Sequence, residues 1–289
     1  MSSYLLITNP FSSRALKERD ISEIVSLFAL GGASVDVVRT RGPGDALKSV
    51  SEIRRGYSAV VAAGGDGTIN EIINGLDGHH VPVGIIPCGT ANVLARELGI
   101  PHSFKKAVDV VLEGKELPLD VGLAGDRRFM LMASAGYDAL VVADAHRKRG
   151  PRFGYASFIM PMLRTLWRAK FPEIKVTMDG KAFTCRHVVV ANAPGYGGPF
   201  RPAPHAVYND GLLDVVLYLR RGRYNMIRYG LRALCCSQFL KERDVLLMRG
   251  EKVRLSSSED VPYQIDGDPA GKLPVTIKIR RDSATFIVP

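Results

Sequence analysis

The chain has 289 residues, which is enough for one large domain or two modest ones. Apolar residues make up 46% and charged residues 24%, so the composition excludes disordered and collagen-like chains. The formal net charge of +10 favours anionic partners, namely nucleic acid, anionic membranes or phosphorylated ligands.

The N-terminus, the longer apolar stretches and the cysteines bear on the compartment. Residues 1–7 have neither a basic segment nor a small-residue cleavage site, so they predict a first strand rather than a signal peptide. The nearest candidate for a membrane span, residues 153–167, contains Pro161 and Arg164 and is too short. The four cysteines lack the spacing of a disulfide framework or a zinc site. These features predict a cytoplasmic protein that contacts membranes only peripherally.

Strand and helix patterns alternate from the N-terminus to Asp120. Apolar runs predict strands at residues 4–8, 35–38, 59–63 and 81–86. Apolar residues at helical spacing predict helices around residues 21–28, 46–53, 69–76 and 91–98. Such alternation predicts an α/β domain over residues 1–120, with a parallel sheet covered by helices on both faces.

After Asp120 the predicted strands succeed one another with turns between them. They cover residues 174–178, 183–191, 213–219, 252–255, 262–265 and 275–279, and Asp179-Gly180 is a hairpin signal. Helical stretches are predicted around residues 139–147, 153–168 and 224–234. This pattern predicts a mostly antiparallel, β-sandwich-like domain with inserted helices over residues 121–280. Whether the last strand, about 280–289, returns to the first domain stays open.

The segment Gly64-Gly65-Asp66-Gly67-Thr68 comes after a buried strand and opens a helix. Glycines let a backbone approach a ligand closely, and the N–H groups at a helix start bind anions. A carboxylate in a phosphate-binding loop is unfavourable without a cation, so Asp66 is a candidate to act on Mg²⁺, directly or through water. The alternative is a glycine-rich turn in which Asp66 only caps the helix. The position at the carboxyl end of a strand favours the ligand site.

Other phosphate-binding signatures are missing from the sequence. It has no GxxxxGK[ST] segment, no GxGxxG after a strand, and no HRD or DFG pair. P-loop enzymes, dinucleotide-binding Rossmann domains and protein kinases are therefore disfavoured.

The glycine-rich segment and the residues after it resemble the diacylglycerol kinase catalytic domain family. Residues 64–68 with Asn70-Glu71 and Asn74-Gly75 are similar to the GGDGTxNEVxNG signature of that family. Further segments match in chain order: Asn9-Pro10, Pro87–Asn92, Leu119-Asp120, Gly136–Ala139, Asp210–Asp214 and Asp266–Asp268. The GGDGT segment also occurs in NAD kinases and phosphofructokinases, so the ordered matches carry the resemblance.

The resemblance implies a set of site residues. The ATP site would be lined by Asn9, Thr40, Gly64, Gly65, Asp66, Gly67, Thr68, Ile69, Asn70 and Thr90. A structural Mg²⁺ would be held by Asp210 with the backbone carbonyls of Val207 and Leu212. Asp66, Asp120 and Asp266 would organise the catalytic Mg²⁺ through water. Asp268 takes the position of the general base that accepts the proton of the substrate hydroxyl.

The sequence departs from the family at two positions. Asp268 stands where the family has Glu, so the base is one methylene shorter, and Val93 stands where soluble bacterial diacylglycerol kinases have Asp. Asp266 and Asp268 lie two residues apart, and on a strand both would point to one face. The alternative is a polar Asp-Gly-Asp-Pro turn with solvated carboxylates.

Other side-chain clusters give weaker signals. The histidines, including His146, show no metal-ligand spacing and are interpreted as surface or satisfied residues. The basic cluster at 145–152 beside the apolar stretch 153–167 is either a solvated helix end or a contact with anionic lipid. Arginines and tyrosines alternate over 218–229, but no nucleic-acid module accompanies them, so nucleic acid is not expected.

These observations predict an ATP- and Mg²⁺-dependent lipid kinase that phosphorylates a lipid hydroxyl at an anionic membrane surface. Diacylglycerol, giving phosphatidic acid, is the first choice of substrate, and a sphingoid base or ceramide is the next. The alternatives are an NAD kinase-like enzyme and a lipid- or nucleotide-binding relative without catalysis. A homodimer is left open.

Overall fold

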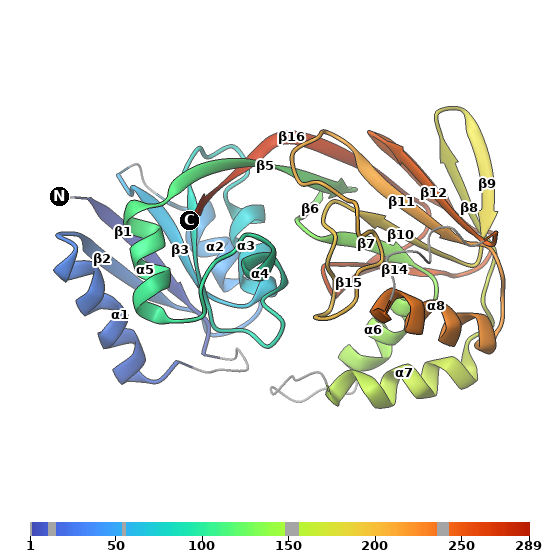
Figure 1. Ribbon diagram of the computed structural model, residues 1–289, viewed down its shortest axis with the longest axis horizontal. Coiled ribbons are helices and arrows are strands. Elements are labelled where there is room, and N and C mark those ends of the chain that lie inside the picture. The colour runs from blue at the N-terminus through green and yellow to red at the C-terminus, as the bar shows by residue number, and fades with distance from the viewer. Residues whose placement is uncertain (1, 11–15, 54–55, 148–155, 236–242) are drawn as a thin grey trace. The chain divides into compact units, whose positions relative to one another are not determined.

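The computed structural model describes residues 2–10, 16–53, 56–147, 156–235 and 243–289 (Figure 1). The chain divides into two compact units. The first is built mainly from Met1–Leu119 and Asp282–Pro289, and the second from Asp120–Gly150 and Gly154–Arg281. No helix in the described ranges is both long and apolar enough to cross a membrane.

The first unit contains a parallel sheet with the strand order β2-β1-β3-β4. Its strands are β1 (Ser3–Thr8), β2 (Ser34–Arg39), β3 (Ala59–Gly64) and β4 (Val83–Pro87). The far end of the long strand β16 (Val275–Val288) lies parallel to β4, where Phe286 is the partner of Val83. Every residue of β3 is buried, as expected for a strand covered on both faces.

Five helices cover this sheet. They are α1 (Glu18–Leu30), α2 (Asp45–Ser51), α3 (Asp66–Gly75), α4 (Val93–Glu97) and α5 (Phe104–Glu113). Helix α1 packs with α5, and α2 packs with α3, so that the two pairs lie on opposite faces of the sheet (Figure 1). The helix predicted at 91–98 is shorter than expected because Asn92 has a left-handed φ of 43° and the helix begins only after it.

The second unit contains two antiparallel sheets, which confirms the predicted β-sandwich-like domain. The first has the order β12-β11-β10-β7-β14-β15. Its strands are β7 (Met132–Ala135), β10 (His187–Ala191), β11 (Leu213–Tyr218), β12 (Val245–Gly250), β14 (Pro262–Ile265) and β15 (Asp268–Lys272). In the second sheet the near part of β16 pairs with β13 (Lys252–Ser256), and β8 (Ile174–Met178) and β9 (Lys181–Cys185) come next. Strand β5 (Lys115–Ala124) pairs with β16 and with β6 (Arg127–Phe129).

The core of the second unit lies between the two sheets. Val176 and Leu255 from one sheet and Val188 and Val190 from the other have no solvent exposure. Each such side chain stabilises the fold by about 1.5–3 kcal/mol relative to an exposed one. The helices α6 (Tyr137–Arg147), α7 (Ala156–Arg168) and α8 (Arg223–Cys235) belong to the same unit, and a second cluster joins α7 and α8 to the six-stranded sheet. Residues 153–155 of the predicted α7 region lie outside the described ranges.

The strand predicted at 183–191 is wrong. Strand β9 ends at Cys185, and β10 begins at His187 in the other sheet. The N–H of Arg186 donates to the carbonyl of Tyr218, which belongs to the six-stranded sheet. Because one apolar run continues across this crossing, the sequence pattern does not mark the point where the chain changes sheet.

Candidate active site

The residues predicted to bind ATP gather at one edge of the sheet in the first unit. Asn9 comes after β1, Thr40 after β2, and Thr90 after β4, while residues 64–70 run from the end of β3 into the first turns of α3. These strands are parallel, so their carboxyl ends lie at the same edge. This edge is where open α/β sheets bind ligands.

Two glycine-containing loops touch at this edge. A Cβ atom on Gly89 would lie 2.5 Å from the Cα of Gly65, and one on Gly65 would lie 3.0 Å from the Cα of Gly89. Both positions therefore need glycine, because a methyl group would push the two backbones apart. Asn92 closes the second loop, since its Oδ1 accepts a hydrogen bond from the N–H of Gly89 at 2.8 Å.

Asp66 joins the two loops through its carboxylate. The N–H groups of Val93 and Leu94, at the start of α4, each donate to one of its oxygens at 3.0 Å. Burial raises the pKa of the Asp66 carboxyl, and these two N–H groups act in the opposite direction. Asp66 thus binds the start of a neighbouring helix, which differs from the alternative of capping its own. A carboxylate has about four acceptor positions, so two hydrogen bonds leave room for a metal.

The other predicted ATP residues present different groups. The amide of Asn9 donates to the hydroxyl of Thr68 at 3.1 Å. Thr40 is buried and donates to the carbonyl of Thr8, and Ile69 is 2% exposed, so at Ile69 only the backbone can reach a ligand. Thr90 is exposed on its loop.

Glu71 has a role that the sequence pattern did not assign. Its carboxylate accepts hydrogen bonds from the N–H groups of Gly44 at 2.9 Å and Ala46 at 3.1 Å. These N–H groups lie at the start of α2, where backbone donors have no helical partner. Glu71 therefore holds α2 as Asp66 holds α4. The feature of the sequence that could have pointed to Glu71 is its place next to Asn70 in the family signature.

Asp266 lies in a turn and Asp268 begins β15, so of the two alternatives left open by the sequence the turn is present and the two residues do not share one strand. Asp266 and Gly267 have φ values of 47° and 92°, and they separate β14 from β15. The carboxylate of Asp266 turns back to accept hydrogen bonds from three consecutive N–H groups, those of residues 130–132, at 2.9–3.0 Å. It fixes the loop between β6 and β7.

Asp268 faces α6 instead, where His146 binds it. The Nε2 atom of His146 lies 3.1 Å from Oδ1 of Asp268, and Nδ1 lies 3.0 Å from the carbonyl oxygen of Val142. The carbonyl oxygen and the carboxylate both only accept, so each contact is a hydrogen bond only where the ring nitrogen carries the hydrogen. The interpretation of His146 as a surface or satisfied histidine missed this contact with the candidate base. The two residues are 122 positions apart, and no spacing rule connects them.

A buried chain of side chains connects the G-x-D-A segment to the Asp266–Asp268 turn. The hydroxyl of Ser134 lies 2.6 Å from Oδ2 of Asp138, and the amide of Gln264 donates to that hydroxyl at 2.7 Å. The Oε1 atom of Gln264 accepts from the N–H of Gly267 at 2.8 Å. Ser134 and Gln264 have no solvent exposure, so this chain sets the position of the turn.

Burial and nearby carboxylates affect the hydroxyl of Tyr196 in the second unit. Its pKa is raised well above the usual value, mainly by burial and further by the charges of Asp138, Asp266 and Asp268. The hydroxyl is therefore a neutral group near three carboxylates.

The residues predicted to hold a structural metal lie together in the second unit. The positively charged side chain of Arg249 already contacts Asp210 there. Oδ1 of Asp210 accepts the N–H of Leu212 at 3.0 Å, and its Oδ2 pairs with the guanidinium of Arg249. The carboxylate of Asp120 accepts the N–H of Gly211 at 2.7 Å. Among the described residues, no group of three or more His, Cys, Asp or Glu side chains is placed to hold a metal. Both carboxylate oxygens of Asp210 therefore have partners without a metal, and the side chains of this loop as they lie do not fit a metal ion.

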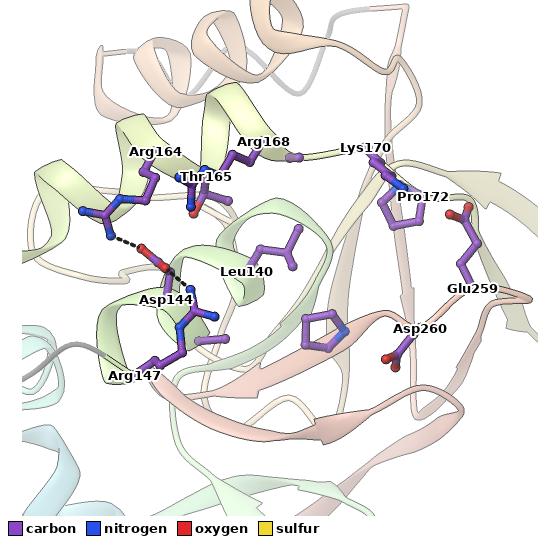
Figure 2. A pocket seen from close by; sticks show the side chains of 13 residues that line it. Leu140, Asp144, Arg147, Arg164, Thr165, Arg168, Lys170, Pro172, Glu259 and Asp260 are labelled. Atoms are coloured by element: carbon purple, nitrogen blue, oxygen red, sulfur yellow. Dashed lines mark hydrogen bonds and ion pairs between the residues drawn. The ribbon is translucent and has the colours of Figure 1, made fainter.

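A pocket of about 580 Å³ opens beside α6 in the second unit (Figure 2). Its apolar lining includes Leu140, Pro172 and Pro262. At one side Asp144 lies between Arg147 and Arg164 and pairs with each at 2.7 Å (Figure 2). Seven of its thirteen lining residues are charged, so the pocket offers both apolar and charged contacts to a ligand.

Comparisons with known proteins agree over nearly the whole chain. Residues 3–124 match the family model of the diacylglycerol kinase catalytic domain, and residues 132–288 match that of the YegS C-terminal NAD kinase beta sandwich-like domain. The diacylglycerol kinase of Bacillus subtilis (strain 168) is 29% identical over 275 residues, covering 93% of this chain and 90% of that protein. The diacylglycerol kinase of Staphylococcus carnosus (strain TM300) is 26% identical over 274 residues, covering 93% and 89%.

Solved structures share the fold. A crystal structure of a diacylglycerol kinase from Bacillus anthracis (strain Sterne) aligns with a TM-score of 0.77 at 22% identity and covers 100% of this chain and 97% of its own. Another from the same organism aligns with a TM-score of 0.82 at 24% identity, covering 100% and 95%. At this identity the likeness supports the architecture alone.

Proposed function

The chain belongs to the diacylglycerol kinase catalytic domain family, a family of lipid kinases, and we propose on that premise that it transfers the γ-phosphate of ATP to the hydroxyl of diacylglycerol. The observation that carries the proposal is the contact of the two glycine loops through Asp66 at the carboxyl edge of the first sheet. Phosphoryl transfer needs alignment and charge neutralisation more than covalent chemistry, and such an edge supplies both.

The first unit binds the nucleotide in this proposal. The backbone N–H groups of residues 64–68 and the start of α3 face the phosphates, with Asn9, Thr40, Asn70 and Thr90 around them. Asp66 would hold Mg²⁺, which when bound neutralises charge on the phosphates. The spare acceptor positions of Asp66 support this role.

Asp268 accepts the proton of the lipid hydroxyl in the second unit. His146 holds Oδ1 of Asp268, which leaves Oδ2 for the hydroxyl. Asp266 keeps the turn in place through the backbone of residues 130–132. The aspartate in place of glutamate is compatible with this role because the neighbouring His146 fixes its direction.

The pocket beside α6 receives the apolar part of the lipid. Ala143, Asp144 and Arg147 of its lining come from the same helix as His146. An acyl chain would contact the apolar side chains of the pocket. Arg147 and Arg164, which pair with Asp144, would face the more polar groups of the lipid.

The decisive test is incubation of the purified protein with radiolabelled ATP, Mg²⁺ and a mixed lipid extract, with the labelled product identified by mass spectrometry. We expect phosphatidic acid. A labelled sphingoid base or ceramide would move the substrate to another lipid. A parallel reaction with NAD separates the NAD kinase alternative, and labelling of NAD without any lipid would refute the proposal. Binding of ATP without turnover on any lipid would favour the non-catalytic alternative.

A further inference from the structure

Helices α7 and α8 carry most of the exposed apolar surface. Among the described residues, eight of the twelve large apolar side chains with high exposure lie on these two helices. Trp167 is 69% exposed and Tyr224 is 77% exposed. Soluble proteins rarely leave large aromatic side chains in water in such numbers, and a gathering of them marks an interaction surface.

The end of α7 and the start of α8 are fastened together by Arg223. Its guanidinium donates to the carbonyl oxygen of Leu166 at 3.2 Å and to that of Trp167 at 2.8 Å. These are carbonyls of the last helical turn, which lack helical partners. The same guanidinium lies 5.0 Å from the centre of the Trp167 ring. Trp167 and Arg223, the residue before Tyr224, are therefore in direct contact at this junction.

Three positively charged side chains line a hollow at this junction. The hollow, about 570 Å³, is lined by Lys170, Arg221 and Arg223, together with Ala169, Phe171 and Gly222. No carboxylate occurs among its described lining residues. In the part of the chain that the structure describes, Lys170 and Arg221 form no ion pair, whereas Arg228 nearby in sequence pairs with Asp244.

We propose that the α7–α8 junction binds a bilayer that contains anionic phospholipid. Lys170, Arg221 and Arg223 contact headgroup phosphates, and Trp167 and Tyr224 enter the interface between headgroups and acyl chains. Aromatic rings favour that depth, and nearby cations are attracted to an anionic leaflet. The apolar residues Ile227 and Leu231 on α8, 48% and 57% exposed, favour a bilayer over nucleic acid, which offers no apolar surface.

The purpose of this surface rests on the proposed function, because a kinase that acts on lipid must meet its substrate at a membrane. The binding itself needs neither ATP nor diacylglycerol. A protein that fails the kinase test can therefore still pass the binding test, and the two proposals fail separately.

Trp167 is the single tryptophan of the chain, so its fluorescence reports on this junction alone. We would titrate the full chain with vesicles of phosphatidylcholine and with vesicles that also contain phosphatidylglycerol. With the anionic vesicles we expect emission at shorter wavelength and quenching by brominated acyl chains. With phosphatidylcholine alone, binding should be weaker by at least tenfold.

Two variants and a matched control test the named residues. The double substitution Lys170→Gln and Arg221→Gln should weaken partitioning about 25-fold, since each cation near an anionic surface contributes about fivefold. Tyr224→Ser should weaken it by several-fold. The control Lys181→Gln and Lys252→Gln makes the same change of charge at exposed positions on strands β9 and β13 and should have less than a twofold effect.

An unchanged Trp167 spectrum with anionic vesicles would overturn the proposal. So would an equal loss of binding in the control variant, because the attraction would then come from net charge and not from this junction. Kinase activity on detergent-dispersed lipid should be the same in the Tyr224→Ser variant as in the original protein, which separates binding from chemistry.

Discussion

In the first unit, the candidate site is presented mainly by backbone. Gly65 and Gly89 touch, and carboxylates fasten the starts of the adjoining helices, Asp66 for α4 and Glu71 for α2. In the second unit, side chains position one another, as in the contact of His146 with Asp268. A site of the first kind can be recognised in a short segment of sequence, whereas a site of the second kind depends on contacts between distant segments.

Substitution of Asp268 is expected to have the largest effect on the candidate site of the second unit. Asp268→Asn should lower kcat by about 10²–10⁴-fold, because an amide cannot accept the proton of the hydroxyl. The thermal midpoint should hardly change, since the side chain is 48% exposed. Steady-state kinetics on dispersed diacylglycerol measures kcat, and thermal unfolding measures the midpoint. Asp126→Asn, at an exposed turn, is the control, and an active Asp268→Asn protein would exclude Asp268 as the base.

In the first unit, substitutions at the contact of the two glycines should instead change the free energy of unfolding. Gly89→Ala places a methyl group 2.5 Å from the Cα of Gly65, so we expect the free energy of unfolding to fall by about 1–3 kcal/mol and ATP binding to be lost. Gly67→Ala is the matched control, because a Cβ there meets nothing within 4 Å and the residue is helical. It should leave stability unchanged or raise it by up to about 1 kcal/mol. Equal behaviour of the two variants would mean that the loops do not need to touch.

His146→Gln tests whether side chains in the second unit position one another. We expect kcat to fall about tenfold, the value of one charge-assisted hydrogen bond, with KM unchanged. A purely structural role would lower the thermal midpoint and leave the kinetic constants of the folded fraction alone. His102→Gln, an exposed histidine in the first unit, should change neither.

The smallest effect concerns the loop predicted to hold a structural metal. Because Arg249 already pairs with Asp210, removal of divalent metal with EDTA should leave the thermal midpoint unchanged. A clear fall of the midpoint in EDTA for the original protein would show that this loop holds a metal after all.

The same contrast explains which features could be predicted from the sequence. The alternating pattern and the Gly64–Thr68 segment predicted the sheet of the first unit and the edge where the candidate site lies, because these depend on short stretches of chain. At Asp266 the sequence left a strand and a turn open, because the contacts that hold its positive φ come from residues 130–132, which lie far away in the sequence. The strand change after Cys185 was missed for a similar reason, since the partner of Arg186 is Tyr218.

Strand β16 has a consequence for the order in which the protein is made. Phe286 is fully buried beside β4, so residues 282–289 complete the sheet that begins with β1. A ribosome must therefore synthesise all of the second unit before the first can acquire its last strand. Until residues 282–289 are made, the sheet of the first unit lacks its last strand. A chaperone bound to the nascent chain would then meet the open edge of β4.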